Sequence, residues 1–422
     1  MKPARSVPGV FHTEDAGSRQ SEKIRRVRAL LDRRAVSHYR RSIPLWVFAC
    51  LLSWGVASLW MRERWPRSVL EAGLFALAAW LLLSGRVDWN WRLGVLVFAA
   101  GWGGVQIWFG WTVYRHATLE AALFWAAAAS AYLGARGVVR DRIEVARVRL
   151  GMAWFGVGLA VVTVVQLYTS QGRAYWLFES GYSENVLGPF VNRNNYAAFM
   201  ELLLPLALVE AFSGRPRSFW FQAGAARMFA SVIASGSRAG SLIVTAEVVI
   251  VGALCWRRNR SGVTVFRLVG LAAVLTAVAG WALLWVRLQD DDPLLGRREY
   301  LEASIEMARQ RPWTGFGLGT WPQVYPAYAV VDDGTFANRA HNDWAEWAVE
   351  GGIPFVAALA LLLAGSLRRA WNSVWGLGLA AVCIHALVDY PFARLGQAVW
   401  WFALLALTGP LRGPDRCEGG EG

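Results

Sequence analysis

Two arginines stand in short polar segments of a kind that binds anions. Arg193 lies in the run Asn192-Arg193-Asn194-Asn195, and Arg238 lies among the serines and glycines of 235–241. A guanidinium group pairs with phosphate through two parallel hydrogen bonds and stays charged at any working pH. Each arginine precedes an apolar run, and helix N-termini add backbone N–H groups that favour anions. Taken singly, either residue also fits an interfacial arginine in contact with lipid phosphate.

Among the five histidines of the chain, His341 is the one best placed for proton transfer. It ends a long polar segment and comes just before the apolar run 343–367. A histidine at such a boundary can exchange protons near neutral pH, because an unperturbed imidazole has a pKa of about 6.5. His385 lies inside another apolar run, where we expect a buried core residue with its polar atoms satisfied.

No motif in the chain indicates a metal or a cofactor. The run Gly315-Phe316-Gly317-Leu318-Gly319 resembles a dinucleotide fingerprint, but it follows a predicted helix and Pro312 rather than a strand. We expect these glycines to let the loop backbone turn tightly against the rest of the protein. None of the four cysteines has metal-ligand or disulfide-framework spacing, so the sequence predicts neither kind of site.

The elements that must position these residues are apolar helices. The chain is 55% hydrophobic and only 17% charged, whereas soluble domains are nearer a quarter charged. Runs of about 20 apolar residues can cross a hydrocarbon core as helices, and lipid leaves no unpaired backbone groups for isolated strands. The sequence therefore predicts an all-α polytopic membrane protein with about twelve transmembrane helices and a large helical periplasmic loop. The runs cover about 43–61, 68–84, 93–111, 117–135, 151–170, 195–213, 218–235, 239–256, 266–286, 343–367, 371–388 and 395–411.

Charge gives the orientation of these helices. The net charge is +13, and all but two of the 43 basic residues are arginine. Arginines crowd into the N-terminal segment and into alternate connections, which predicts that both termini lie in the cytoplasm. The positive charge is therefore an orientation signal and does not indicate nucleic-acid binding. The exception is the connection 62–67, where Arg62, Arg64 and Arg67 fall on the opposite, outer side.

We divide the chain into a basic cytoplasmic tail (1–42), a transmembrane domain (43–411) and a cytoplasmic C-terminal tail (412–422). Two substantial loops, about 171–194 and about 287–341, then lie on the outer face. Loops of this length are usually functional or disordered. The second contains a predicted amphipathic helix over 297–311, with Pro312 at its end. We expect one side of that helix to carry Tyr300, Leu301, Ile305 and Ala308.

Charges inside the predicted spans are few. A charged side chain near the centre of a spanning helix costs about 3 kcal/mol, so it needs a partner or a polar cavity. We expect Arg227 to form a structural pair with Glu247 or Glu201.

Three segments, taken in order, resemble the O-antigen ligase/polymerase superfamily of bacterial membrane glycosyltransferases. The first is Gly188-Pro-Phe-Val-Asn192 with the residues that follow, and the second is Ser237-Arg238 through Leu242. The third is the outer loop from Gly296-Arg297 to Gly319, followed by His341-Asn342 and Glu350-Gly351-Gly352. The resemblance runs from about Gly188 to Gly352 and implies a fold similar to the GT-C-like O-antigen ligase fold.

The resemblance also implies an activity at the bacterial inner membrane. A glycan on undecaprenyl diphosphate is transferred to lipid A–core or a related glycan acceptor on the periplasmic side, with inversion and without a metal, cofactor or nucleotide sugar. In this reaction His341 is the expected general base, and Arg193 and Arg238 bind the diphosphate. Arg297 is a third expected anion contact. Asn194 and Asn342 are expected to orient the reacting groups.

Two other functions fit parts of the same pattern. The same residues suit an O-antigen or exopolysaccharide polymerase, because the acceptor is not specified by them. A membrane transporter would place polar groups near the bilayer midplane, often in paired repeats with broken helices. We find no convincing internal repeat, and the polar residues cluster at one membrane face. The expected partners are therefore membrane lipids, the lipid-linked donor and a glycan acceptor.

Overall fold

The computed structural model describes residues 43–139, 141–179, 186–259, 262–289, 295–330, 336–370 and 374–408. The predicted tails 1–42 and 412–422 and the aspartates at 290–292 lie outside the described residues. Contacts divide the chain into two units, residues 1–49 and residues 50–422. The second unit contains all the residues that the sequence singled out for chemistry.

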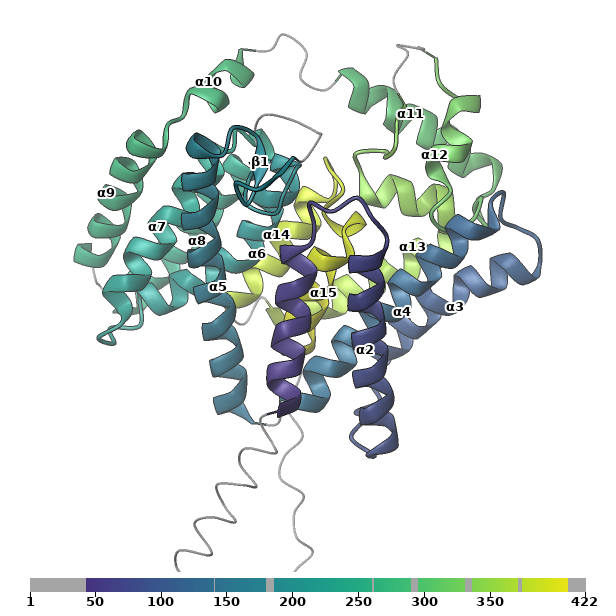
Figure 1. Ribbon diagram of the computed structural model, residues 1–422, viewed down its shortest axis with the longest axis horizontal. Helices are drawn as coiled ribbons and strands as arrows, with labels where there is room; N and C mark the ends of the chain where they lie inside the picture. Colours follow the sequence, from purple (N-terminus) through teal and green to yellow (C-terminus); the bar gives the residue numbers. More distant parts are fainter. Residues whose placement is uncertain are drawn as a thin grey trace, which may run out of the picture. The chain divides into compact units, whose positions relative to one another are not determined.

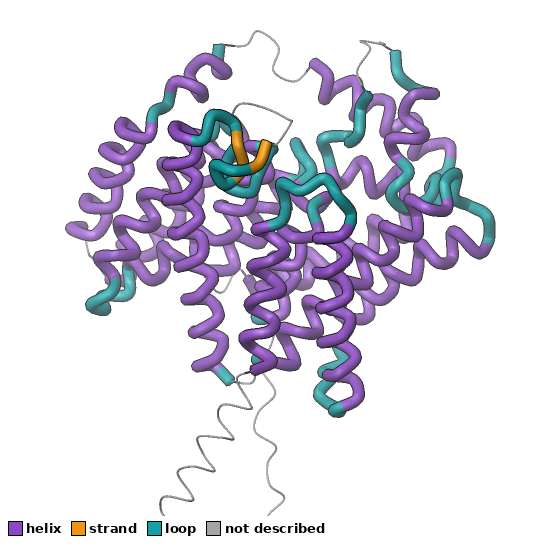
Figure 2. The backbone as a smooth tube through the Cα atoms, in the orientation of Figure 1, coloured by secondary structure: helices purple, strands orange, loops and turns teal. Residues whose placement is uncertain are grey.

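The described residues are almost entirely helical, which confirms the predicted all-α class (Figures 1 and 2). The first of the two loops predicted to be outer adds one antiparallel pair of two-residue strands, β1 (Arg173–Ala174) and β2 (Phe178–Glu179). The α-helices are α2 (Trp65–Leu83), α3 (Trp91–Trp108), α4 (Arg115–Val138), α5 (Arg142–Thr169), α6 (Arg193–Ala211), α7 (Ser218–Ala234), α8 (Arg238–Asn259), α9 (Gly262–Ala279), α10 (Ala282–Leu288), α11 (Leu295–Gln310), α12 (Trp321–Val324), α13 (Asp343–Ala370), α14 (Leu377–His385) and α15 (Leu395–Ala406). Short 3₁₀ turns are η1 (Tyr325–Ala327), η2 (Val374–Gly376) and η3 (Pro391–Ala393).

The protein is a polytopic membrane protein. Within the described ranges, 5 helices are long and apolar enough to cross a membrane. They are α2, α5, Arg238–Cys255 of α8, α9 and Asp343–Gly365 of α13. Shorter apolar helices cover Ile43–Ala57, Val374–His385 and Leu395–Ala406. Within the described residues, each of the twelve predicted runs contains helix, although only these five are long and apolar enough on their own.

The predicted run 266–286 is not one helix. It breaks at Gly280 into α9 and α10, because Gly280 has a φ of +81° that other residues rarely adopt. The hydroxyl of Tyr168 donates a hydrogen bond to the carbonyl of Ala279 at the same point. A Cβ atom on Gly280 would lie 2.7 Å from that hydroxyl, so glycine permits this close approach. The run 371–388 is also shorter than predicted, since α14 ends at His385.

Helix α6 is the central element of the second unit. Nearly every side chain along it is buried, and it packs against α5, α7, α8 and α14. Helix α4 packs against α3 and α15, and the ring of Trp125 on α4 meets those of Trp347, Phe355 and Phe402 edge-on. Because large aromatic side chains bury much apolar surface, these contacts fix α13 and α15 against α4.

The glycine run of the second loop predicted to be outer turns tightly, as expected. Gly315, Gly317 and Gly319 all have positive φ angles. The loop is then hydrogen bonded to α13, through Phe316 N to the carbonyl of Val349 at 2.9 Å and Gly317 N to that of Glu350 at 3.1 Å. A Cβ atom on Gly315 would lie 2.1 Å from the carbonyl oxygen of Glu350. Only glycine allows this contact, which seats the loop on α13.

Helix α11 confirms the predicted amphipathic helix, but its buried side differs from the one expected. Tyr300 and Ala308 pack into a small core with Ala303 and Met307, which lie on the same side of the helix. Leu301 is 37% exposed and Ile305 is 44% exposed, so the expectation that all four predicted residues share a packed side is wrong. The buried face of α11 is rotated relative to the predicted one, because Trp321 and Tyr325 of the loop pack beside Tyr300.

The predicted pair of Arg227 with Glu247 or Glu201 is wrong. Glu201 instead pairs with His385, whose Nδ1 lies 2.7 Å from its Oε1, and both side chains are fully buried. This contact confirms His385 as a buried core residue with a polar partner at Nδ1. The expectation that all its polar atoms are satisfied is wrong, because the buried Nε2 has no hydrogen-bond partner among the described residues. Arg227 lines an apolar cavity between α5, α7 and α9. Helix α14 packs against α6, and this packing brings His385 to Glu201.

Candidate active site

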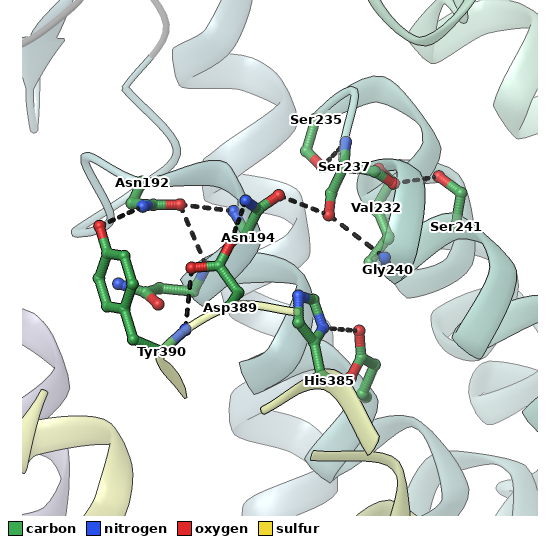
Figure 3. A network of polar contacts seen from close by, with 12 residues as sticks. Asn192, Asn194, Val232, Ser235, Ser237, Gly240, Ser241, His385, Asp389 and Tyr390 are labelled. Atoms are coloured by element: carbon green, nitrogen blue, oxygen red, sulfur yellow. Dashed lines mark hydrogen bonds and ion pairs between the residues drawn. The ribbon is translucent and has the colours of Figure 1, made fainter. Parts of the chain in front are cut away.

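The N-termini of α6 and α8 lie together and form one wall of the candidate site. Asn192 caps α6, because its Oδ1 accepts hydrogen bonds from the backbone N–H of Asn194 at 2.8 Å and of Asn195 at 3.4 Å. Such a cap stabilises a helix by about 1 kcal/mol. The hydroxyl of Ser237 donates to Asn194 Oδ1 at 2.9 Å, which joins the two helix starts (Figure 3).

Close helix packing makes this junction possible. A Cβ atom on Gly240 would lie 2.4 Å from the Cβ of Ala197, so α8 approaches α6 more closely than a larger residue permits. Arg193 and Arg238 are the neighbours of Asn194 and Ser237 in the chain. The two arginines predicted to bind diphosphate therefore begin two adjoining helices at the same end of the unit.

The carboxylate of Asp389 is the centre of the site. Its Oδ2 accepts hydrogen bonds from Asn194 Nδ2 and, at 3.1 Å, from Arg297 Nη2. Its Oδ1 accepts from the backbone N–H of Tyr390 at 2.9 Å and lies 3.4 Å from His341 Nδ1. The side chain of Asp389 is 1% exposed. One buried carboxylate therefore contacts residues from α6, from α11 and from the segment before α13.

His341 is held in an unusual backbone conformation. Its φ is +51°, in the left-handed region that costs a residue other than glycine about 1–2 kcal/mol. The ring packs edge-on against Tyr390, with 4.8 Å between centroids, and lies parallel to Tyr300 at 6.2 Å. Tyr390 is fixed in turn, since its hydroxyl accepts from Asn192 Nδ2 at 2.8 Å. The imidazole remains 29% exposed, so it can meet a substrate.

The start of α13 is fastened to the segment that carries Asp389. The backbone N–H of Asp343 donates to the carbonyls of Ala386 at 3.0 Å and Asp389 at 3.2 Å. Asp343 Oδ2 accepts from the backbone N–H of Phe392 at 2.9 Å. Asn342 Oδ1 accepts from the backbone N–H of Ala345 at 3.0 Å, so the side chain of Asn342 caps α13. These bonds fix the spacing between His341 and Asp389.

The electrostatics of the site keep Asp389 ionised. Burial by itself raises the pKa of this carboxyl, but the contacts with His341 and Arg297 outweigh burial and leave the pKa below its usual value. The ionised carboxylate faces Nδ1 of His341 at 3.4 Å, so a positive charge that develops on the ring during proton transfer lies beside a negative group. The described residues contain no group of three or more histidine, cysteine or acidic side chains that could hold a metal ion.

The predicted site residues fall into two groups. His341, Arg297 and Asn194 all contact Asp389. Arg193 and Arg238 stand one residue from the Asn194–Ser237 hydrogen bond, and Arg238 Nη1 also donates to the carbonyl of Arg287 on α10 at 3.0 Å. Asn342 is adjacent to His341, but its side chain serves the helix cap.

Sequence reasoning missed Asp389. It is the first residue after the predicted run 371–388, on the side where the predicted topology also places His341 and Arg238. An acid directly after an apolar run, on the same side as a predicted histidine base, was the available signal.

Comparison with known families gives one match. Residues 223–360 match a family described as O-antigen ligase, so this stretch is an O-antigen ligase family domain. The match confirms the resemblance stated from the sequence and includes Arg238, Arg297 and His341. Asn194 and Asp389 lie outside the matched residues. No curated protein matches the chain.

Proposed function

We propose that the protein is an O-antigen ligase-like glycosyltransferase, which moves a glycan from undecaprenyl diphosphate to a sugar hydroxyl of lipid A–core or a related acceptor. The reaction takes place on the periplasmic side of the bacterial inner membrane, with both termini in the cytoplasm. The observation that carries this proposal is the position of His341, 3.4 Å from a buried carboxylate and beside two helix N-termini.

His341 acts as the general base. Its Nδ1 faces Asp389, which leaves Nε2 to take the proton from the acceptor hydroxyl. The hydroxyl oxygen forms a bond to the anomeric carbon of the donor while the bond from that carbon to the diphosphate oxygen breaks. Attack opposite the leaving group inverts the anomeric configuration. Asp389 holds the ring and stabilises the imidazolium, in the way a carboxylate supports a histidine in other base-catalysed reactions.

The leaving group is the lipid diphosphate, on which negative charge grows. Arg193 and Arg238, at the starts of α6 and α8, supply guanidinium groups, and the helices supply N–H groups and dipoles. Groups fixed in advance around a developing charge lower the barrier more than groups that must reorient. Arg297 is held near this position by Asp389 and adds a third positive charge. Asn194 orients the same carboxylate.

The test is transfer by purified protein in a bilayer, supplied with undecaprenyl-diphosphate glycan and lipid A–core. His341→Ala should reduce transfer by about 10²–10⁴-fold, while the variant still inserts and binds the donor. His116→Ala is the matched control, since His116 is 67% exposed at the start of α4 and does not contact Asp389. Transfer by His341→Ala at the rate of the control would refute the assignment.

The same assay separates the alternatives. Chain lengthening without lipid A–core identifies a polymerase, whereas product formed only with lipid A–core identifies a ligase. A transporter is excluded if Arg238→Ala stops transfer by purified protein while solute flux across vesicles stays unchanged.

A further inference from the structure

A polar cavity lies beside the candidate site, at a place where the arginines do not follow the charge pattern that predicts the orientation of the helices. It has a volume of about 270 Å³, just below the range of about 300–1,000 Å³ that is typical of small-molecule sites. Its wall includes the outer connection 62–67, the exception to the orientation rule. Five arginines line it, together with Glu63 and Glu120: Arg62, Arg64, Arg67, Arg339 and Arg394. We call this the outer arginine cavity.

Acidic partners hold three of these arginines in place. Arg64 pairs with Glu71 at 2.8 Å and with Glu120 at 2.9 Å, and Arg67 pairs with Glu71 at 2.8 Å. Arg339 pairs with Glu346. Guanidinium groups that carboxylates already hold in place lose little conformational entropy when an anion binds, so they form a preorganised site.

The groups that line the cavity are mainly positive, since five arginines and two glutamates form its wall. Further acidic side chains act on these arginines from outside the wall: Glu71, Glu346, Glu350 and Asp343. Arg62 is exposed and Arg394 is partly exposed, so both can be reached from the cavity mouth. A hollow with this lining favours a compact anion that accepts hydrogen bonds from several arginines.

The cavity adjoins the reaction centre along two chain segments. Arg339 precedes His341 by two residues, so their Cα atoms lie within about 7 Å. Arg394 follows Asp389 by one short turn, η3. A smaller cavity of about 160 Å³ continues past Arg67, Glu120 and Arg339, which line both. A molecule with a hydroxyl at His341 therefore has the outer arginine cavity within reach of its adjacent groups.

We propose that the outer arginine cavity is a subsite for the acceptor and binds a phosphate or carboxylate group carried by the acceptor glycan. The inference rests on the proposed function, because it assigns the cavity to the second substrate of that reaction. The donor diphosphate has its own arginines, Arg193 and Arg238, beside the Asn194–Ser237 junction. Arg62, Arg64, Arg67 and Arg394 lie outside the residues that match the O-antigen ligase family.

The experiment uses the full chain in a bilayer and two acceptors, lipid A–core with its phosphates and the same lipid after chemical dephosphorylation. The double variant Arg62→Gln with Arg394→Gln should raise the KM for the phosphorylated acceptor about tenfold or more. Its kcat, its donor KM and its KM for the dephosphorylated acceptor should stay within about twofold of wild type. Arg115→Gln is the matched control, since it removes one exposed arginine at the start of α4, outside the cavity.

Binding of each acceptor to the protein, measured by titration in the absence of turnover, separates this inference from the proposed function. Wild type and His341→Ala should both bind the phosphorylated acceptor more tightly than the double variant does. Binding without any transfer would count against the proposed function and leave the subsite intact. An equal loss of affinity for both acceptors in the double variant, or a raised donor KM, would overturn the proposed subsite. So would a loss seen only when anionic phospholipid is present, because the occupant would then be a lipid headgroup.

Discussion

Replacing Asp389 with Asn tests the candidate site most directly, because it removes one negative charge and keeps the shape of the side chain. The carboxylate faces His341 with Oδ1 and accepts a hydrogen bond from Arg297 with Oδ2. An amide has only one oxygen, so it can face the histidine or the arginine but not both. The other of the two donors is left facing an NH₂ group.

The magnitude follows from the 3.4 Å between His341 Nδ1 and Asp389 Oδ1. At an effective dielectric constant of about 20, an imidazolium and a carboxylate at this separation attract by roughly 5 kcal/mol. Water reaches the partly exposed ring, so we take about half of this attraction as the loss in the transition state. A loss of roughly 2.5 kcal/mol corresponds to a kcat about 50- to 100-fold lower.

The assay is transfer at saturating donor and acceptor, repeated across pH. In its proposed role Asp389 positions the base without touching substrate, so kcat should fall while both KM values change by less than about threefold. Asp88→Asn is the matched control, because Asp88 is paired with Arg136 at the opposite end of α4 and is remote from the site. A kcat for Asp389→Asn within about threefold of that control would show that the carboxylate does not assist His341.

Three further predictions concern stability, pH and donor binding. Gly315→Ala should lower the free energy of unfolding by about 3 kcal/mol or more, whereas Gly85→Ala, with the same positive φ but open space around it, should cost about 1 kcal/mol in the same thermal melts. Because the pKa of Asp389 is lowered by folding, its contribution to stability is complete above the unfolded pKa and is lost as pH falls through the folded one. The Tm difference between wild type and Asp389→Asn should therefore stay constant from about pH 8 to 5 and shrink below about pH 4; a difference that grows with acid contradicts this sign. Arg238→Lys should raise the donor KM about tenfold with little effect on folding, since lysine cannot form the paired hydrogen bonds of a guanidinium, and an unchanged donor KM would remove Arg238 from the diphosphate site.

Helix positions could be predicted from the sequence because apolar runs of spanning length are a strong local signal. The tight turns at Gly315–Gly319 and the end of α11 before Pro312 also followed from local rules. The centre of the site could not be predicted, since Asp389 meets His341 and Arg297 only after α11, α13 and the end of α14 have packed. The same holds for Glu201, whose partner His385 is nearly two hundred residues away in the chain.

Helix α9 shows that the lipid surroundings form part of the scaffold of the site. Only 11% of its spanning window is buried inside the protein, and α7 is its main packing partner. The rest of its apolar surface is solvated by acyl chains, so the bilayer replaces the neighbours that other helices have. Helix α9 continues at Gly280 into α10, whose Arg287 carbonyl accepts a hydrogen bond from Arg238, so we expect a change in bilayer thickness to reach this candidate diphosphate ligand. Detergent micelles of poorly matched thickness will thus disturb the donor side of the site before they disturb the buried pair of His341 and Asp389.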